Sequence, residues 1–131
     1  MGGDIELNNL LYVKEHKIYD DVVLLDGRHL PFRDNSFDCV LACEVIEHMK
    51  KEDGIKLLNE AERVAEEKVI VSTPLLGARY YYNEKHHISK WTVSDLHKRG
   101  YKVRGVGFSF FGRFTTYRLA FALAPLAYCI R

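Results

Sequence analysis

Three short apolar runs, with a helical stretch between the last two, constrain the fold of this chain more than any other feature. Val22–Leu25, Phe37–Cys43 and Val69–Val71 are almost continuously apolar, which is typical of strands buried in a parallel sheet. Residues 51–67 instead repeat their apolar side chains along one face of a helix. This alternation predicts an α/β fold, a Rossmann-like open and mostly parallel sheet with helices on both faces.

The remaining segments extend the same pattern toward both ends of the chain. Thr92 and Asp95 resemble a capping box with Asp in place of Glu, and Gly100 is a good helix stop. The other expected elements are a helix over 10–16, a strand over 101–108, a helix over 117–124 and a last strand over 127–131.

Size and composition exclude several classes of protein. The chain has 131 residues and a net charge of +1, so we expect a single domain over residues 1–131 without the strong positive field of a general nucleic-acid binder. The three cysteines are too few for a disulfide scaffold and favour buried thiols in the cytoplasm. The apolar stretch 119–130 contains Pro125 and is shorter than the ~20 residues of a membrane-spanning helix.

Polar residues follow the expected strands where each one ends. Asp26 follows the first run, Glu44 follows the second, and Ser72 and Thr73 follow the third. The carboxyl ends of parallel strands form the ligand-binding edge of a doubly wound sheet. Asp26 is either a ligand for an amine or a hydroxyl group, or a turn residue before a glycine.

The string LLDGRHLPFRDNSFDCVLACEVIEHM, residues 24–49, resembles the central signature of the type 11 group of class I S-adenosylmethionine-dependent methyltransferases. The strand VIVSTP, the Trp-Thr helix start at Trp91 and the string GYKV from Gly100 agree with it. The resemblance covers about residues 3 to 108 and implies S-adenosylmethionine as the cofactor.

The resemblance also implies roles for individual residues in cofactor binding. Asp4 would hold the ribose hydroxyls, and Asp26 would accept a hydrogen bond from the adenine amino group. The backbone amides of Gly27 and Arg28 would lie near the adenine ring. The methionine end of the cofactor would be bordered by Cys43 and Glu44.

One part of the family pattern has no counterpart in this sequence. If Gly3 and Asp4 end the second strand of the family fold, then its first strand, its first helix and its Gly-rich loop are missing, and the fold is N-terminally truncated. Three explanations stay open: a coding sequence that starts upstream of Met1, a fragment completed by a homodimer or by a partner chain, or a non-catalytic relative. We expect weak or no cofactor binding unless something completes the sheet.

A cluster of acidic residues and histidines allows two interpretations. Without a metal, His48, His86 or His87 is the candidate general base. In the alternative, Glu44, Glu47 and His48 share one face of a helix that begins by Glu44, and they bind a divalent metal with His86 or His87. That arrangement resembles the metal-dependent small-RNA terminal 2′-O-methyltransferases.

The resemblance therefore predicts methyl transfer to an unidentified acceptor, impaired in this chain unless the cofactor site is completed. A small-molecule acceptor is favoured over a nucleic acid. Two alternatives remain: a metal-dependent RNA methyltransferase, and a non-catalytic subunit or dimerising fragment.

Overall fold

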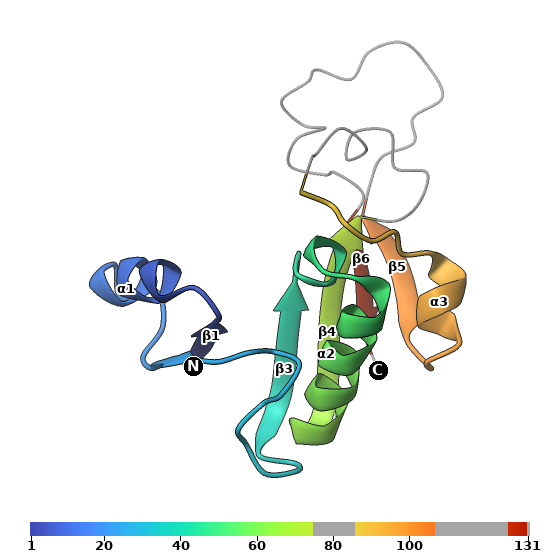
Figure 1. Cartoon of the computed structure of the whole chain (residues 1–131). Coiled ribbons are helices and arrows are strands. Elements are labelled where there is room, and N and C mark those ends of the chain that lie inside the picture. Colours follow the sequence, from blue (N-terminus) through green and yellow to red (C-terminus); the bar gives the residue numbers. More distant parts are fainter. Residues whose placement is uncertain (75–85, 107–125, 131) are drawn as a thin grey trace.

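The computed structural model describes residues 1–74, 86–106 and 126–130. Within them the chain forms an α/β fold, which Figure 1 shows. In chain order the elements are β1 (Gly2–Asp4), α1 (Leu7–Glu15), β2 (Val22–Leu24), β3 (Phe37–Cys43), the 3₁₀ helix η1 (Ile46–His48), α2 (Lys51–Val64), β4 (Ala65–Pro74), α3 (Val93–His97), β5 (Lys102–Val106) and β6 (Leu126–Ile130).

The strands among the described residues form two sheets. β1 and β2 pair in parallel, while the larger sheet has the order β3-β4-β6-β5. β3 and β4 are parallel, and β6 runs antiparallel to both of its neighbours. The parallel pairs and their helical crossovers confirm the predicted Rossmann-like α/β class.

The main core lies between the larger sheet and the helices α2 and α3, which cover the same face of that sheet in Figure 1. The helical spacing predicted the buried side of α2 correctly. The apolar residues of the predicted face, the last of which is the first residue of β4, are all at least nine-tenths buried: Leu57, Leu58, Ala61, Val64 and Ala65. The capping box at Thr92 is also present, and Gly100 has a φ of +86°, which glycine adopts without strain.

Trp91 joins three elements of the core. Its ring is 1% exposed and lies so close to Gly54 of α2 that a Cβ there would sit 2.6 Å from Cζ2. Its Nε1–H donates to the carbonyl oxygen of Ile46 at 3.2 Å and to Oγ of Ser89 at 3.0 Å. The ammonium group of Lys51 lies 3.9 Å from the ring centroid. Trp91 therefore packs in the core.

Several sequence expectations need correction or lie outside the described residues. The first helix spans 7–15 and not the expected 10–16. α2 ends at Val64, three residues before the expected end, because Ala65 already pairs with Phe37 in the parallel sheet and that pairing overrides helix propensity. Cys39 and Cys43 are free and exposed, not buried. The expected helix over 117–124 is outside the described residues.

No helix among the described residues is long and apolar enough to cross a membrane.

Candidate functional site

The candidate site lies at the carboxyl ends of β1 to β4. β1 ends at Asp4, and β2 is followed closely by Asp26. β3 ends at Cys43, one residue before Glu44, and β4 ends with Ser72, Thr73 and Pro74. Since β1 is parallel to β2 and β3 is parallel to β4, the polar ends of each pair gather at one edge.

Asp4 lies at the start of α1. Its Oδ1 accepts a hydrogen bond from the backbone N–H of Glu6 at 2.8 Å, and its Oδ2 accepts one from the side-chain amide of Asn9 at 3.1 Å. Each carboxylate oxygen has a further lone pair. The side chain is thus fixed in place and can still accept from a hydroxyl group.

Asp26 is held by Arg28. The guanidinium Nε lies 2.9 Å from Oδ1, Nη2 lies 2.6 Å from Oδ2, and the backbone N–H of Arg28 donates to Oδ1 at 2.9 Å. Nη1 also reaches Oδ2 of Asp53 on α2 at 3.4 Å. These hydrogen bonds to Arg28 lower the pKa of Asp26 to about 2. Its carboxyl group is therefore an ionised acceptor at any physiological pH.

Gly27 has a packing reason to be glycine. A Cβ at this position would lie 2.9 Å from Cδ1 of Leu57. The turn after β2 therefore lies close against α2, and a side chain at residue 27 would require the Leu57 side chain to move.

Glu44 takes an uncommon backbone conformation after β3, with a φ of +53°. Non-glycine residues rarely adopt this left-handed region, and such residues cluster at functional sites. The backbone N–H of Glu44 donates to the carbonyl of Ser72 at 2.9 Å, and its carboxylate accepts from Oγ of Ser72 at 2.9 Å. The helix does not begin by Glu44, because η1 starts only at Ile46.

Glu47 is a buried carboxylate with one unsatisfied oxygen. The residue is 1% exposed; Oε2 accepts from Oγ1 of Thr73 at 3.0 Å, while Oε1 has no hydrogen-bond partner among the described residues. Burial and the nearby Glu44 charge raise the pKa of Glu47 to about 7. A buried polar atom without a partner is uncommon and points to a ligand or a proton at this position.

Two histidines lie beside this carboxylate. One ligand atom each of Glu47, His48 and His87 lies within 4.8 Å of the others. The rings of His48 and His87 meet edge to face, with centroids 4.9 Å apart. Nδ1 of His48 donates to the carbonyl of His86 at 3.2 Å when it carries the proton, which leaves Nε2 as an acceptor 4.0 Å from Oε1 of Glu47.

The structure thus brings together some of the predicted general bases and some of the predicted metal ligands. Glu47, His48 and His87 converge, whereas Glu44 bonds to Ser72 and His86 contributes its carbonyl to His48. Ser72 and Thr73, to which no role was assigned from the sequence, donate side-chain hydrogen bonds to Glu44 and Glu47, respectively. Their position directly after an apolar strand was the available signal.

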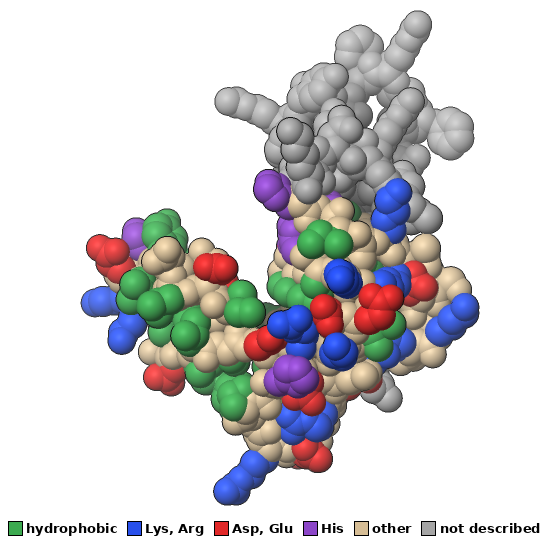
Figure 2. Space-filling model, viewed as in Figure 1, with side chains coloured by type: hydrophobic (Ala, Val, Ile, Leu, Met, Phe, Trp, Pro, Cys, Tyr) green, Lys and Arg blue, Asp and Glu red, His purple; other side chains and the backbone are tan. Residues whose placement is uncertain are grey.

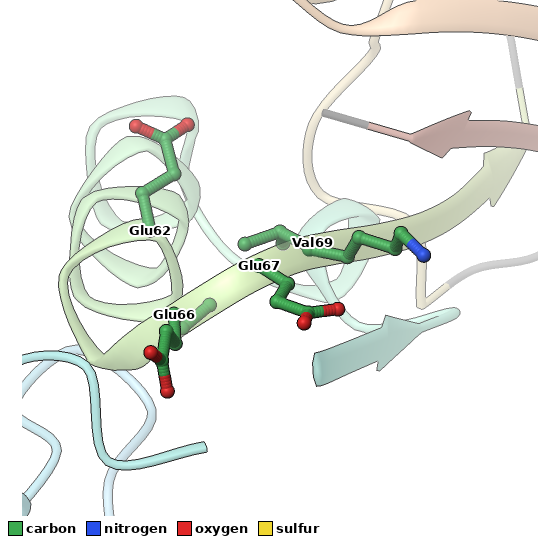
Figure 3. Close-up of a pocket in the computed structure, with 6 residues that line it drawn as sticks. Glu62, Glu66, Glu67 and Val69 are labelled. Carbon is green, nitrogen blue, oxygen red and sulfur yellow. The ribbon is translucent and has the colours of Figure 1, made fainter. Parts of the chain in front are cut away.

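A pocket elsewhere on the surface is separate from this edge. It has a volume of about 260 Å³ and is lined by residues 62 and 65–69, at the start of β4 and not at its carboxyl end (Figure 3). The Glu62 carboxylate there already accepts from Arg99 at 3.1 Å and from Tyr101 at 2.9 Å. We assign no role to this pocket.

Comparison with known proteins defines the class. The profile of the methyltransferase-domain family matches residues 1–72, so the chain belongs to that family. The fold is that of S-adenosylmethionine-dependent methyltransferases.

A relative from Methanocaldococcus jannaschii, an uncharacterised protein, is 33% identical over 108 residues. The match covers 76% of this chain and 44% of the relative, so the chain spans less than half the length of that protein.

Two solved structures share the fold at low sequence identity. The chain assigned as a methyltransferase in the Haloferax volcanii complex with the Trm112 methyltransferase activator is 16% identical, with a TM-score of 0.73; the match covers 98% of this chain and 68% of that one. A Thermotoga maritima S-adenosylmethionine-dependent methyltransferase, described as a possible histamine N-methyltransferase, is 17% identical, with a TM-score of 0.70 and coverage of 99% and 71%.

Proposed function

We propose that this chain contributes the nucleoside-binding half of an S-adenosylmethionine site and transfers a methyl group to a small-molecule acceptor. The observation that carries the proposal is the pair of acidic residues at the carboxyl ends of the adjacent parallel strands β1 and β2. Asp4 is the proposed acceptor for the ribose hydroxyls, and Asp26 is the proposed acceptor for the adenine amino group. The near-neutral net charge of +1 favours a small acceptor over a nucleic acid.

The cofactor, when bound, supplies an electrophilic methyl group on a positively charged sulfur. The residues of this chain would mainly orient the reactants. Gly27 and Arg28 would border the adenine, and Cys43 and Glu44 would border the methionine end. A proton leaving the acceptor would pass to His48 or His87, which lie together beside Glu47. His86 remains a weaker candidate base, since its carbonyl is what contacts His48.

The first test measures the binding of S-adenosylhomocysteine to the chain. Binding is monitored through chemical-shift changes of the backbone amide signals in NMR spectra. We expect the chain to bind with a Kd on the order of 100 µM or weaker, with shifts concentrated at residues 4 and 25–29. Replacing Asp26 with Asn should weaken binding by roughly tenfold, because a hydrogen bond to a charged acceptor contributes about 1.5–3 kcal/mol. Asp38→Asn, at an exposed position on β3, is the matched control.

Two outcomes would count against this assignment. Shifts confined to other parts of the chain would contradict the site, and equal affinities for Asp26→Asn and Asp38→Asn would contradict the role of Asp26. Binding at low micromolar Kd would instead contradict the expectation that this chain alone has an incomplete pocket.

A divalent metal at Glu47, His48 and His87 is a second candidate feature of the site. The donor set fits, because one carboxylate and two imidazoles suit Zn²⁺ or Mn²⁺, and the unsatisfied Oε1 of Glu47 points to a missing partner. Glu44, whose carboxylate accepts a hydrogen bond from Ser72, would lie next to the metal ligands and would not itself be a ligand. This feature would favour the metal-dependent alternative over a metal-free methyltransferase.

Titration calorimetry with ZnCl₂ and with MnCl₂ tests the metal. We expect binding by the unmodified chain, weakened by at least about tenfold in His87→Ala, because each ligand contributes to the site. His29→Ala removes an exposed histidine and should bind as the unmodified chain does. Equal metal binding by both variants would contradict a metal site at Glu47, His48 and His87. His48 and His87 would then remain candidate general bases.

The free thiols of Cys39 and Cys43 support the proposal that the protein works in a reducing compartment such as the cytoplasm.

A further inference from the structure

The turn that carries Asp26 lies in a segment without regular secondary structure. Residues 26–36 join β2 to β3 and contain no helix or strand. The N–H of His29 donates to the carbonyl of Asp26 at 2.9 Å, which closes the turn. Because strand pairing does not continue through this segment, the conformation of the turn depends on contacts with the elements beside it.

α2 supplies such contacts from one face. Asp53, Leu57 and Glu60 are four and three residues apart, which places them along the same side of a helix. Asp53 accepts from Nη1 of Arg28 at 3.4 Å, and the Leu57 side chain lies against Gly27. Glu60, further along this face, contacts the chain just after the turn. The turn and the residues that follow it thus lie along this face of α2.

Glu60 acts together with Arg63, which is close to one helical turn further along α2. Oε2 of Glu60 accepts from the backbone N–H of Leu30 at 2.8 Å, and Nη2 of Arg63 donates to the carbonyl of Leu30 at 3.0 Å. Nη1 of Arg63 donates to the carbonyl of Phe32 at 2.8 Å. The pair therefore holds both backbone groups of Leu30 and the carbonyl of Phe32.

Every N–H group of the Arg63 guanidinium has an acceptor. Nε donates to Oε1 of Glu60 at 2.8 Å, and Nη2 donates to Oε2 of Glu60 at 2.8 Å as well as to Leu30. Nη1 donates to Oδ1 of Asp34 at 2.8 Å as well as to Phe32. The bonds from Arg63 and from the Leu30 N–H lower the pKa of Glu60, so its carboxyl group is ionised at neutral pH. A planar guanidinium can make all these contacts, whereas the ammonium group of lysine cannot.

Charged side chains of both signs cover this part of the molecule. Figure 2 shows them interleaved over the region of α2, whereas hydrophobic side chains gather over α1 and the β1–β2 pair. The side chains of Arg63 and Glu60 are 32% and 22% exposed, so their bonds are partly shielded from water. Hydrogen bonds between ionised groups and a backbone are directional and stronger than neutral ones. Such bonds fix the conformation of the segment as well as its distance from α2.

We propose that Glu60 and Arg63 are positioning residues for the nucleoside end of the cofactor, and that their hold on Leu30 and Phe32 keeps the preceding turn in the conformation that binds adenine. The inference rests on the proposed function, because that function assigns Asp26 to the adenine amino group. Neither Glu60 nor Arg63 would touch the cofactor, since both act through the backbone. A turn that spends less time in its binding conformation weakens the apparent affinity in proportion.

The test compares Arg63→Lys with Arg99→Lys. Arg99 is the matched control because it also forms an ion pair with α2, through Glu62 at 3.1 Å, and its side chain is 22% exposed. Its acceptors on α2 are Glu62 and Asn59, not the backbone of the segment that carries the turn. Both variants therefore lose a guanidinium bound to α2, and only Arg63→Lys loses the contacts with Leu30 and Phe32.

Two NMR measurements separate positioning from a general loss of stability. Backbone order parameters at residues 27–29 of the free chain report the turn itself, and shifts at residues 25–29 give the Kd of S-adenosylhomocysteine. In Arg63→Lys we expect the order parameters to fall from about 0.85 to below about 0.6 and the Kd to rise about fivefold. In Arg99→Lys we expect both to stay as in the unmodified chain. Urea denaturation measures the free energy of unfolding of each variant, which a merely structural role would lower without changing the turn.

A second pair of variants keeps the test decisive if Arg63→Lys does not fold. Glu60→Gln keeps an oxygen that accepts from the Leu30 N–H but removes the charge that pairs with Arg63, so it should raise the Kd about threefold. Glu62→Gln removes the equivalent charge beside Arg99 and should leave the Kd unchanged.

The outcomes distinguish this inference from the proposed function. Equal Kd values in Arg63→Lys and Arg99→Lys would overturn the inference and leave the proposed function intact. A raised Kd with unchanged order parameters would also overturn it, because the effect would not then pass through the turn. Absence of shifts at residues 25–29 in the unmodified chain would overturn the proposed function and this inference with it.

Discussion

Replacing Trp91 with Ala should lower the free energy of unfolding by about 3–5 kcal/mol. The indole is the largest of the fully buried side chains among the described residues. Its removal would leave a cavity against Gly54 and would end the hydrogen bond to Ile46 and the contact with Lys51. Since a small domain has only about 5–15 kcal/mol in total, this one change would remove much of its stability.

Urea denaturation followed by circular dichroism measures this loss. Ile88→Ala is the control, because Ile88 is close in sequence but 65% exposed, and the change should stay within about 0.5 kcal/mol. If Trp91→Ala does not fold at all, Trp91→Phe should give a smaller, measurable loss. A loss below about 1 kcal/mol in Trp91→Ala would mean that the ring does not hold η1, α2 and the residues before α3 together.

The second large effect is a decrease in the free energy of unfolding with rising pH, caused by Glu47. The pKa of this carboxyl is raised from 4.5 to about 7, chiefly by burial. Between these two values the folded chain holds a proton that the unfolded chain releases, so the unfolding free energy falls as the pH rises from about 5 to 8. The difference between the two pKa values corresponds to a loss on the order of 3 kcal/mol above pH 7.

Glu47→Gln keeps the shape of the protonated side chain and removes the titration. In buffer with a chelator, the variant and the unmodified chain should have similar stability at pH 5, and the variant should be more stable at pH 8. Glu67→Gln, at an exposed position on β4, should leave the pH dependence unchanged. An unmodified chain that gains stability from pH 5 to 8, with Glu47→Gln changing in parallel, would show that the carboxylate is ionised and satisfied in the folded state.

Several features of the site follow from neighbours in sequence, and these were predictable. The two ends of β3, the buried face of α2 and the capping box at Thr92 are set by side chains within a few residues of one another. The placement of Asp26 directly after an apolar run was also readable, and its bond to Arg28 spans only two residues. Residue spacing encodes such contacts because the local backbone geometry fixes which side chains share a face.

Contacts between distant segments were not predictable from spacing. Either His86 or His87 could have joined Glu47, and it is His87 whose ring lies beside it in the structure. The left-handed Glu44 exists because its backbone and carboxylate both bond to Ser72, which is 28 residues away. The apolar run around Cys39 and Cys43 predicted that both thiols are buried. They are exposed, because no described residues cover the face of β3 that points away from α2.

The sequence by itself determined the α/β alternation, the family signature and the acidic residues at the strand ends, since each depends on local order along the chain. Only the tertiary structure decided that the described strands form two sheets, with β1 beside β2 in one and the order β3-β4-β6-β5 in the other. It also decided that Trp91 is a core residue, through packing against Gly54. The physical reason is that hydrophobic periodicity specifies which face of an element is buried, whereas pairing and packing partners depend on segments far apart in the chain.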